Sequence, residues 1–499
     1  MKKYIFKTGL LFFTAAAVVY LGCNKKELDL LPHGPTEANY FAQESDFQKA
    51  TFGVYSKLSD VYWYNGGSSL APMNLAEGDD ITTNDANQAF ETFGQVQPSN
   101  GSVSYMYGIW YQMIARANVL LEKIAGVKDG IYTNPNLKSY NKGEALFLRG
   151  LANYYLWNYY GTAPLRLERV TDANQFTPGN STGTQLLEQA IKDFTDAASL
   201  LPAAWDASNR GRATANAANG MLGKALIFKA SASKTTADYA AAITAFNKIS
   251  GVSLMPNFAD NFAFDTENNA ESLFEFQATQ PFGLDNVWLS NDFDNAVGSM
   301  SVFWGFYNNV SLNGQSRFYA TPKLLAAFDA GDPRLDSTVK VSDKTIRKYV
   351  TRDKFTQTNV ASANNPRILR YADVLLLKAE AILQSGGLPS DAIALVNQVR
   401  TRARNMVPAG TAPANYLTTE TDKAKIMGWI MNERFIELAA EGQRWFDLRR
   451  WHLQGLITLN NAFFSSNVAM AFDAAKHLYM PIPNSELDVN PNMKQNPGY

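Results

Sequence analysis

A charged and aromatic run near the C-terminus, residues 432–451, constrains the fold of this chain more than any other stretch. Its first half reads as an amphipathic helix, because apolar residues recur near the 3.6-residue helical period. The acids Glu433, Glu437 and Glu441 are spaced four apart, so their carboxylates lie along one face of that helix. Gly442 can adopt the left-handed conformation that ends a helix. A second apolar face follows, formed by Trp445, Phe446, Leu448 and Trp451.

This mixture of acids, arginines and aromatics allows two interpretations. One is a glycoside hydrolase centre using Glu437, Glu441 or Asp447, which needs two acids of different pKa. The other is a set of Glu–Arg ion pairs that lock two helices together. Every acid in the run has an arginine nearby in sequence, and a guanidinium group lowers the pKa that an acid catalyst needs raised. Structural ion pairs also outnumber catalytic ones, so we favour the second interpretation.

The N-terminus has the pattern of a lipoprotein signal peptide over residues 1–22. Two lysines follow Met1, and the apolar run at 9–21 has about 13 residues, fewer than the ~20 of a membrane-spanning helix. It ends at Gly22 and Cys23, which resemble a bacterial lipobox, in which the cysteine is diacylated. The alternative is an ordinary signal peptide with a chance cysteine. Because Cys23 is the chain's only cysteine, we favour lipidation, and two acyl chains give stable membrane anchoring.

A polar, proline-bearing tether at residues 23–43 leads into one large region, 44–499, that we expect to be mainly α-helical. An Ala-Ile-x-x-apolar phrase recurs within its helical segments, at 190–194, 242–246 and 392–396. It is typical of tetratricopeptide-like helix pairs, which bury their core by stacking on neighbours. The predicted helices cover residues 44–58, 105–124, 138–160, 184–200, 213–230, 238–249, 321–328, 370–384, 390–404 and 422–440.

Two long stretches, residues 62–100 and 251–366, lack this helical pattern and are rich in Gly, Asn and aromatic residues. Residues 272–277 alternate like a strand within the second stretch. Long loops in a compact domain usually carry function. We therefore expect these two stretches to fold locally and to carry function.

Several functional classes are disfavoured. The chain has no G-x-S-x-G, H-E-x-x-H or phosphate-binding glycine loop. Its three histidines are scattered and it has one cysteine, which nearly excludes a zinc site. A formal net charge of −1 does not attract nucleic acid. We expect no catalytic residues and no cofactor, although Asp79 and Asp80 could ligate a structural calcium ion with loop carbonyls.

The sequence also resembles a known family. The run at 432–451, the Arg-Tyr-Ala-Asp-Val-Leu-Leu segment at 370–376, the Asp-Pro-Arg triplet at 332–334 and the proline- and asparagine-rich tail at 481–499 are similar to markers of the SusD/RagB family. With the lipobox, these motifs extend over essentially the whole chain in the expected order. Ala440 and Gln443 depart from the Phe and His that the family signature has there.

The resemblance implies a surface-exposed outer-membrane lipoprotein that binds an oligosaccharide or a peptide. It also implies a superhelix of tetratricopeptide-like helix pairs with a loop-rich region packed on it, and the loop-rich region would face the ligand. It also implies a partner, a SusC-like TonB-dependent transporter, to which the ligand is delivered without covalent chemistry. Starch-binding members have aromatic residues shortly after Asp79 and Asp80, where this chain has Asn84 and Asn87, so starch specificity is not carried over. The ligand contacts expected by residue type are Trp63, Asp79, Asp80, Asn84, Trp288, Trp304 and Tyr307.

Overall fold

Helices that pack against their sequence neighbours make up most of the computed structural model, which describes residues 40–62, 64–65, 68–279, 300–307, 318–352, 362–464 and 468–499. Residues 1–46 and 47–499 form two units. In the first, the described residues 40–46 include the start of α4 (Glu44–Tyr55), where Asp46 accepts N–H bonds from Ala42 and Gln43. The expected signal peptide and residues 23–39 of the expected tether lie outside the described residues.

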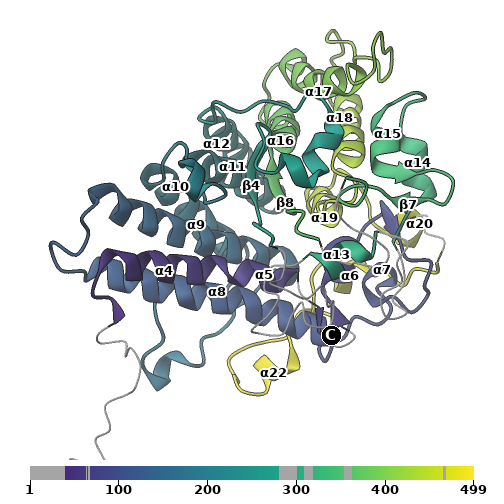
Figure 1. Cartoon of the computed structure of the whole chain (residues 1–499). Coiled ribbons are helices and arrows are strands. Elements are labelled where there is room, and N and C mark those ends of the chain that lie inside the picture. The colour runs from purple at the N-terminus through teal and green to yellow at the C-terminus, as the bar shows by residue number, and fades with distance from the viewer. Residues whose placement is uncertain are drawn as a thin grey trace, which may run out of the picture. The chain divides into compact units, whose positions relative to one another are not determined.

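The second unit confirms the mainly α-helical prediction. Each long helix packs against the next along the chain, as Figure 1 shows for α8 to α12 and for α16 to α18. Side-chain caps define several starts, since Asn100, Thr214 and Asp422 accept N–H bonds from the first turns of α8, α11 and α18. The bounds are α5 (Lys57–Val61), α8 (Gly101–Ala125), α9 (Pro135–Tyr160), α10 (Gln185–Leu200), α11 (Ala215–Ser233), α12 (Thr236–Phe246), α16 (Tyr371–Gln384), α17 (Pro389–Arg404), α18 (Lys423–Glu437) and α19 (Arg444–Gln454).

Glycines set how closely these helices approach. A Cβ added at Gly150 of α9 would lie 3.0 Å from the Phe194 ring on α10. A Cβ at Gly223 of α11 would lie 2.3 Å from the Phe246 ring on α12. Because such contacts are too short for real atoms, the small residues allow the stacking that the recurring Ala-Ile phrase predicts.

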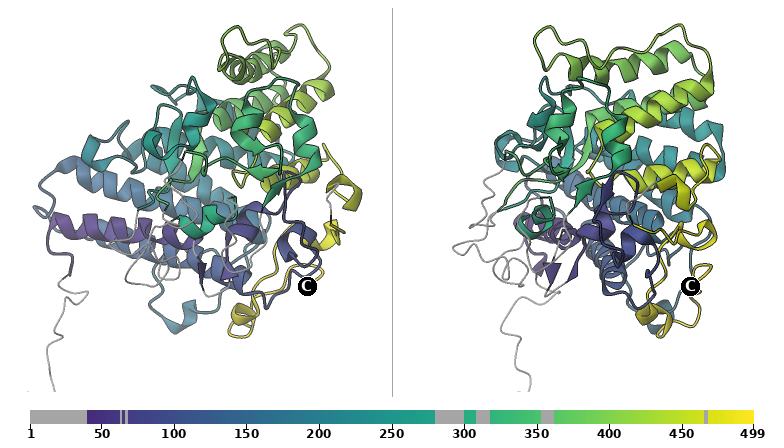
Figure 2. Two further views of the ribbon diagram at one scale, coloured as in Figure 1. Left: turned by 45° about the vertical axis from the view of Figure 1, so that its right-hand side comes forward. Right: turned by 90° about the vertical axis from the view of Figure 1, so that its right-hand side faces the viewer.

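The two irregular stretches join into one short-stranded region although they are far apart in sequence. β3 (Ile81–Thr82) pairs antiparallel with β5 (Tyr319–Ala320), and the sheet order is β3-β5-β7-β6. Both views of Figure 2 show the purple early segment beside the green insert. The other elements are β1 (Tyr64–Asn65), β2 (Ser68–Ser69), α6 (Ala71–Leu75), α7 (Ala89–Thr92), α13 (Ser301–Gly305), α14 (Pro322–Ala327), α15 (Arg334–Thr338), β6 (Val339–Lys340), β7 (Thr345–Ile346), α20 (Asn461–Phe464), α21 (Ala474–His477) and α22 (Asn484–Leu487), with 3₁₀ turns at Ala173–Gln175, Ala207–Asn209, Phe258–Phe262 and Phe264–Thr266.

The predicted strand at 272–277 is confirmed as β4 (Ser272–Glu275), and its partner was not predicted. β8 (Arg367–Arg370) pairs antiparallel with β4 through two irregular register steps. β8 ends at Arg370 and α16 begins at the next residue. Its four residues therefore run directly into the helical pattern and show no separate strand signal.

The end of α18 differs from the sequence expectation. The helix stops at Glu437, and the left-handed residues are Ala440 (φ +60°) and Gly442 (φ +73°). Glu441 therefore lies beyond the helix rather than on one face with Glu433 and Glu437. A β-methyl group makes the left-handed region unfavourable, so Ala440 adopts this turn at a cost in conformational energy.

Candidate functional site

The acids of residues 432–451 lie in a buried ion-pair network. Arg370 donates to Glu271 (2.7 Å), Glu437 (2.6 Å) and Glu441 (2.8 Å). Arg334 also bonds Glu437, at 2.9 Å. These side chains are almost fully buried, and they bring β8, α15 and α18 together with the segment just before β4.

A second part of the network connects α18 to α19. Arg434 donates to Asp447 at 2.8 Å and to Asp373 at 2.8 Å, while Arg450 also bonds Asp447 at 2.9 Å. The prediction that Glu–Arg pairs lock two helices together is refined: the pair between α18 and α19 joins Arg434 to Asp447, while Glu437 pairs with arginines of other elements.

The pKa values of these acids do not suit a hydrolase. Burial alone would raise the pKa of Glu437, but the charges of Arg402, Arg370 and Arg334 lower it below its usual value. Burial is likewise outweighed at Glu441 and at Asp447, where arginines lower the pKa. An acid catalyst needs the opposite shift, a raised pKa. These acids are therefore better suited to holding the packed elements together than to acid catalysis.

Asp79 and Asp80, predicted as solvent-facing ligand contacts, lie in the interior instead. Asp79 is paired with Arg444 and with Lys323 (2.6 Å), and these charges lower its pKa although burial opposes them. Asp80 accepts the N–H of Ala440 at 2.9 Å, and burial raises its pKa to about 6. Their exposed fractions are 1% and 2%. The physical reason for the difference is that both carboxylates tie the loop to the turn after α18.

Trp304 and Tyr307 are also interior residues, with exposed fractions of 2% and 1%. The Trp304 indole stacks on Tyr349 with ring centroids 4.0 Å apart, and its Nε1 donates to the Asn364 carbonyl. The Tyr307 hydroxyl donates to the Ala440 carbonyl at 2.8 Å. Trp304 packs within the insert, and Tyr307 ties the insert to the turn that follows α18, so neither ring is available at the surface.

Asn84 is the predicted contact that the structure exposes, at φ +57°. Hydrogen bonds to Glu91 fix its loop, because the Glu91 carboxylate accepts from the Thr82 hydroxyl (2.5 Å) and from the Thr83 backbone N–H (2.7 Å). Trp63 and Trp288 lie outside the described residues.

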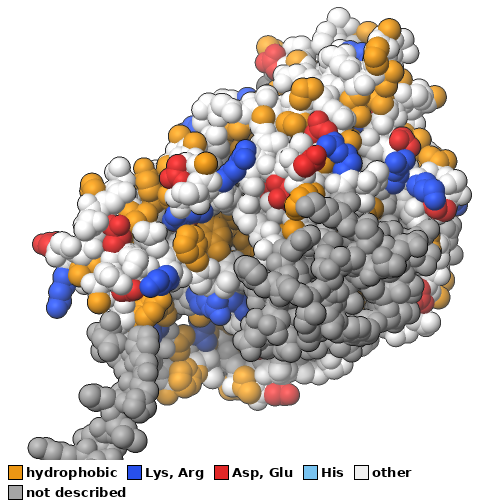
Figure 3. Space-filling view, viewed as in Figure 1, with side chains coloured by type: hydrophobic (Ala, Val, Ile, Leu, Met, Phe, Trp, Pro, Cys, Tyr) orange, Lys and Arg blue, Asp and Glu red, His pale blue; other side chains and the backbone are white. Residues whose placement is uncertain are grey.

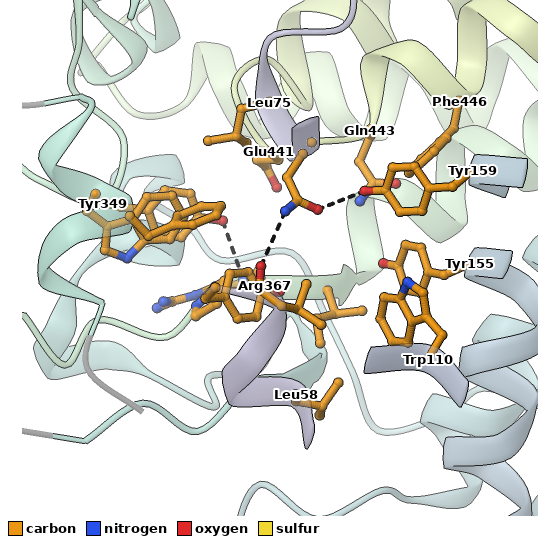
Figure 4. Close-up of a pocket in the computed structure, with 18 residues that line it drawn as sticks. Leu58, Leu75, Trp110, Tyr155, Tyr159, Tyr349, Arg367, Glu441, Gln443 and Phe446 are labelled. Atoms are coloured by element: carbon orange, nitrogen blue, oxygen red, sulfur yellow. Dashed lines mark hydrogen bonds between the residues drawn. The ribbon is translucent and has the colours of Figure 1, made fainter. Parts of the chain in front are cut away.

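An enclosed pocket lined mainly by aromatic residues lies between the helices and the insert (Figure 4). Tyr155 and Tyr159 of α9 face it from one side and Tyr349 from the other. The Tyr159 hydroxyl donates to Asn74 at 2.7 Å, and Trp110 stacks on Tyr155 with centroids 4.7 Å apart. Its full lining is Leu58, Val61, Tyr62, Asn74, Leu75, Trp110, Tyr155, Tyr159, Phe303, Trp304, Tyr349, Pro366, Arg367, Ile368, Glu441, Gly442, Gln443 and Phe446.

The size of this pocket decides what it can hold. Its volume is about 50 Å³, whereas ligand sites usually span ~300–1,000 Å³ and one water needs ~10–15 Å³. It has room for ordered water and none for a sugar ring. Of the ligand contacts predicted from the sequence, Trp304 is the one that lines this pocket. The four-residue spacing of Tyr155 and Tyr159 on one helix face is the signal that could have found more.

Among the described residues, no group of three or more His, Cys, Asp or Glu side chains is arranged to hold a metal ion. In the same part of the chain, no helix is long and apolar enough to span a membrane.

Comparison with known proteins gives matches over nearly the whole chain. One family profile, described as the SusD family, matches residues 303–499, and a second, described as starch-binding associating with outer membrane, matches residues 36–226. SusD-like protein P2 of Formosa agariphila is 25% identical over 100% of both chains. Starch-binding protein SusD of Bacteroides thetaiotaomicron is 22% identical over 98% of both.

Solved structures share the fold. A SusD homolog from Bacteroides thetaiotaomicron matches with a TM-score of 0.76 at 22% identity, covering 93% of this chain and 99% of its own. A laminarin-binding SusD-like protein matches with a TM-score of 0.70 at 21% identity, covering 92% of this chain and 100% of its own. Together with the motifs at 332–334, 370–376 and 432–451, these matches show that the chain belongs to the SusD/RagB family.

Proposed function

We propose that this protein binds an oligosaccharide at the cell surface and delivers it to a partner TonB-dependent transporter of the SusC type. The observation that carries the proposal is the match, over nearly the full length, to relatives named as starch-binding and laminarin-binding proteins. The ion-paired acids of residues 432–451 add support, because their lowered pKa values favour binding without hydrolysis.

The proposed ligand contacts are Trp63, Asn84 and Trp288. Indole rings offer flat apolar faces on which sugar rings stack, and the Asn84 carboxamide can both donate to and accept from hydroxyl groups. The bonds from Thr82 and Thr83 to Glu91 hold the Asn84 loop in place before ligand arrives, which lowers the entropic cost of binding. Asp79, Asp80, Trp304 and Tyr307 are buried and are not proposed as contacts.

The proposed location follows from the N-terminus. Diacylation of Cys23 would anchor the chain in the outer membrane, and one matching family profile is described as associating with that membrane. A lipid-anchored protein stays beside its transporter, so captured ligand has a short path to the channel. Peptide remains the alternative ligand class.

Isothermal titration against a panel of neutral and acidic oligosaccharides and peptides tests the proposal. Wild-type protein is expected to bind at least one oligosaccharide. No peptide should bind more tightly than that oligosaccharide. Trp63→Ala and Trp288→Ala should each weaken that binding about 30-fold, because truncating a tryptophan anchor costs ~2 kcal/mol or more. Trp304→Ala is a poor probe, since removing a buried Trp costs ~3–5 kcal/mol of stability.

Trp429→Ala is the matched control. This tryptophan is half-buried on α18, stacks on Tyr416 with centroids 4.3 Å apart, and is not among the residues proposed as contacts. Its loss should leave affinity within about twofold. Binding of peptides alone, or release of reducing sugar that is lost in Glu437→Gln, would contradict the proposal.

A further inference from the structure

An open groove of about 340 Å³ lies between α4 and the end of β4. None of the residues expected to contact ligand lines it. Figure 3 shows hydrophobic side chains at the surface just above α4, in the direction of β4. The groove residues are Phe52, Tyr55, Ser56, Leu58, Ser59, Ser208, Asn209, Arg210, Gly211, Arg212, Glu275, Phe276 and Gln277.

The floor of the groove is built on a buried ion pair. Arg212 donates to both carboxylate oxygens of Glu144, at 2.8 and 2.6 Å. The Tyr55 hydroxyl donates to the same carboxylate at 2.9 Å and accepts the N–H of Ala213. Bidentate pairs of this kind fix geometry, so the groove has a rigid base before any ligand is present.

Phe52 supplies an aromatic face above this base. Its side chain is 46% exposed although it is a large apolar group on a helix whose other apolar residues are covered. The Arg212 guanidinium lies 5.1 Å from the ring centroid, which positions the ring through a cation–π contact. Phe276 adds a second ring to the lining.

Neutral hydrogen-bonding groups form the rim. The amides of Gln277 and Asn268 bond each other reciprocally, at 2.8 and 3.1 Å. Gly211 lies directly beneath, at φ +91°, where an added Cβ would be 2.2 Å from the Gln277 side chain. Only glycine allows both this backbone conformation and this close approach. The hydroxyls of Ser56 and Ser59 lie on the opposite side.

Charge in and beneath the groove is largely balanced, and Arg116, which donates to the Ser56 hydroxyl at 2.9 Å, adds one cation at the edge. Arg212 is neutralised by Glu144, and Glu275 lies 3.4 Å from Arg367. Arg210 at the rim donates to the Asn268 carbonyl, and the nearby Asp206 carboxylate adds negative charge at Arg212. A charged ligand would therefore gain little, while a purely apolar one would leave the polar rim unpaired.

We infer that this groove is a second saccharide subsite, which takes one or two uncharged pyranose units of an oligosaccharide, stacked on Phe52 and hydrogen-bonded to the amide and hydroxyl rim. The inference rests on the proposed function, because it assumes that the protein binds glycans. A volume of 340 Å³ is at the small end of ligand sites, which suits a short stretch of sugar units. The subsite extends recognition beyond the loops that carry Trp63, Asn84 and Trp288.

The test uses full-length protein without its signal peptide and a panel of neutral hexasaccharides: maltohexaose, laminarihexaose, cellohexaose, xylohexaose and mannohexaose. For each one that binds, Phe52→Ala should weaken binding about tenfold in isothermal titration. Phe52→Trp should restore it, because the aromatic face returns. Phe176→Ala is the matched control, since Phe176 is 60% exposed and does not line the groove; its affinity should equal that of wild type.

The outcomes separate this inference from the proposed function. If a hexasaccharide binds wild type and Phe52→Ala equally, the groove is not a subsite, while glycan binding stands. If no oligosaccharide in either panel binds wild type, both ideas fail. A charged oligouronate that binds through Phe52 more tightly than every neutral hexasaccharide, with an affinity that falls as salt rises, overturns the assignment to uncharged sugars.

Discussion

At the scale of single residues, arginine determines how the C-terminal run behaves. Sequence spacing predicted that Glu437 and Asp447 would be paired rather than catalytic, and the pairs are present. It could not predict most of the partners, because Arg334, Arg370 and Arg402 come from distant elements. Pairing across the fold depends on tertiary packing, which short-range spacing does not encode.

Removing one acid from this network should unfold the protein more readily without harming recognition. Asp447→Ala removes the carboxylate that Arg434 and Arg450 share, although Arg434 keeps Asp373 and Arg450 keeps Glu380. The expected loss is therefore up to ~3 kcal/mol, the lower end of the cost of breaking a buried ion pair. Chemical denaturation should show that loss, while the glycan affinity of the folded fraction stays within about twofold of wild type. Equal stability combined with lost binding would instead place Asp447 at the ligand.

Asp196→Ala supplies the comparison. Asp196 makes an exposed pair with Lys192 on α10, and exposed pairs of this kind are worth ~0–1 kcal/mol. The two variants therefore remove the same chemical group from a buried and an exposed pair.

At the scale of secondary-structure elements, helices were predictable and short strands were not. Each long helix was placed within a few residues of its observed bounds, because caps and the 3.6-residue period are local signals. The two-residue strands β3 and β5 have no period of their own, and they exist because Thr321 bonds the Asp79 and Asp80 carbonyls across the sheet. Asp79 and Asp80 were expected at the surface because the partners that bury them, Ala440, Arg444 and Lys323, are distant in sequence.

Asp80, which joins the start of β3 to the turn after α18, should make the free energy of unfolding depend on pH. Burial raises the pKa of Asp80 from 3.8 to about 6, so the folded state binds more protons than the unfolded state between these values. Asp80 therefore makes stability fall as pH rises through that window, by at most ~3 kcal/mol. Asp80→Asn should lack this contribution and be at least as stable as wild type at pH 7.5, as measured by urea denaturation between pH 4.5 and 7.5.

Asp79 should change the pH dependence of stability in the opposite direction to Asp80, and Asp79→Asn tests this. Arg444 and Lys323 hold the pKa of Asp79 below its usual value, so its stabilising contribution is present above that value and is lost as pH falls. This variant should be less stable than wild type at pH 7.5. If Asp79→Asn and Asp80→Asn gave the same pH profile, the assignment of charge within this junction would be wrong.

At the scale of the whole molecule, binding and anchoring are expected to depend on different parts of the chain. The groove, the pocket and the ion-pair network all belong to residues 47–499. Motif order along the sequence was enough to predict the helical fold. It did not reveal the groove, because Phe52 lies off the apolar face of its helix and looks like any exposed residue until its neighbours are known.

This separation predicts the behaviour of an unlipidated protein. Cys23→Ala removes the only thiol that can carry the acyl chains, so palmitate labelling should disappear and the protein should leave the membrane fraction. Lys25→Ala, which keeps the cysteine, should remain labelled and membrane-bound. Glycan affinity should be equal in both, because neither residue belongs to the unit that carries the proposed contacts.

In cells, uptake of the bound oligosaccharide should fall only in Cys23→Ala, since a released binding protein loses the local concentration that delivery to a transporter requires. Loss of glycan affinity in purified Cys23→Ala would show instead that the N-terminal segment takes part in recognition.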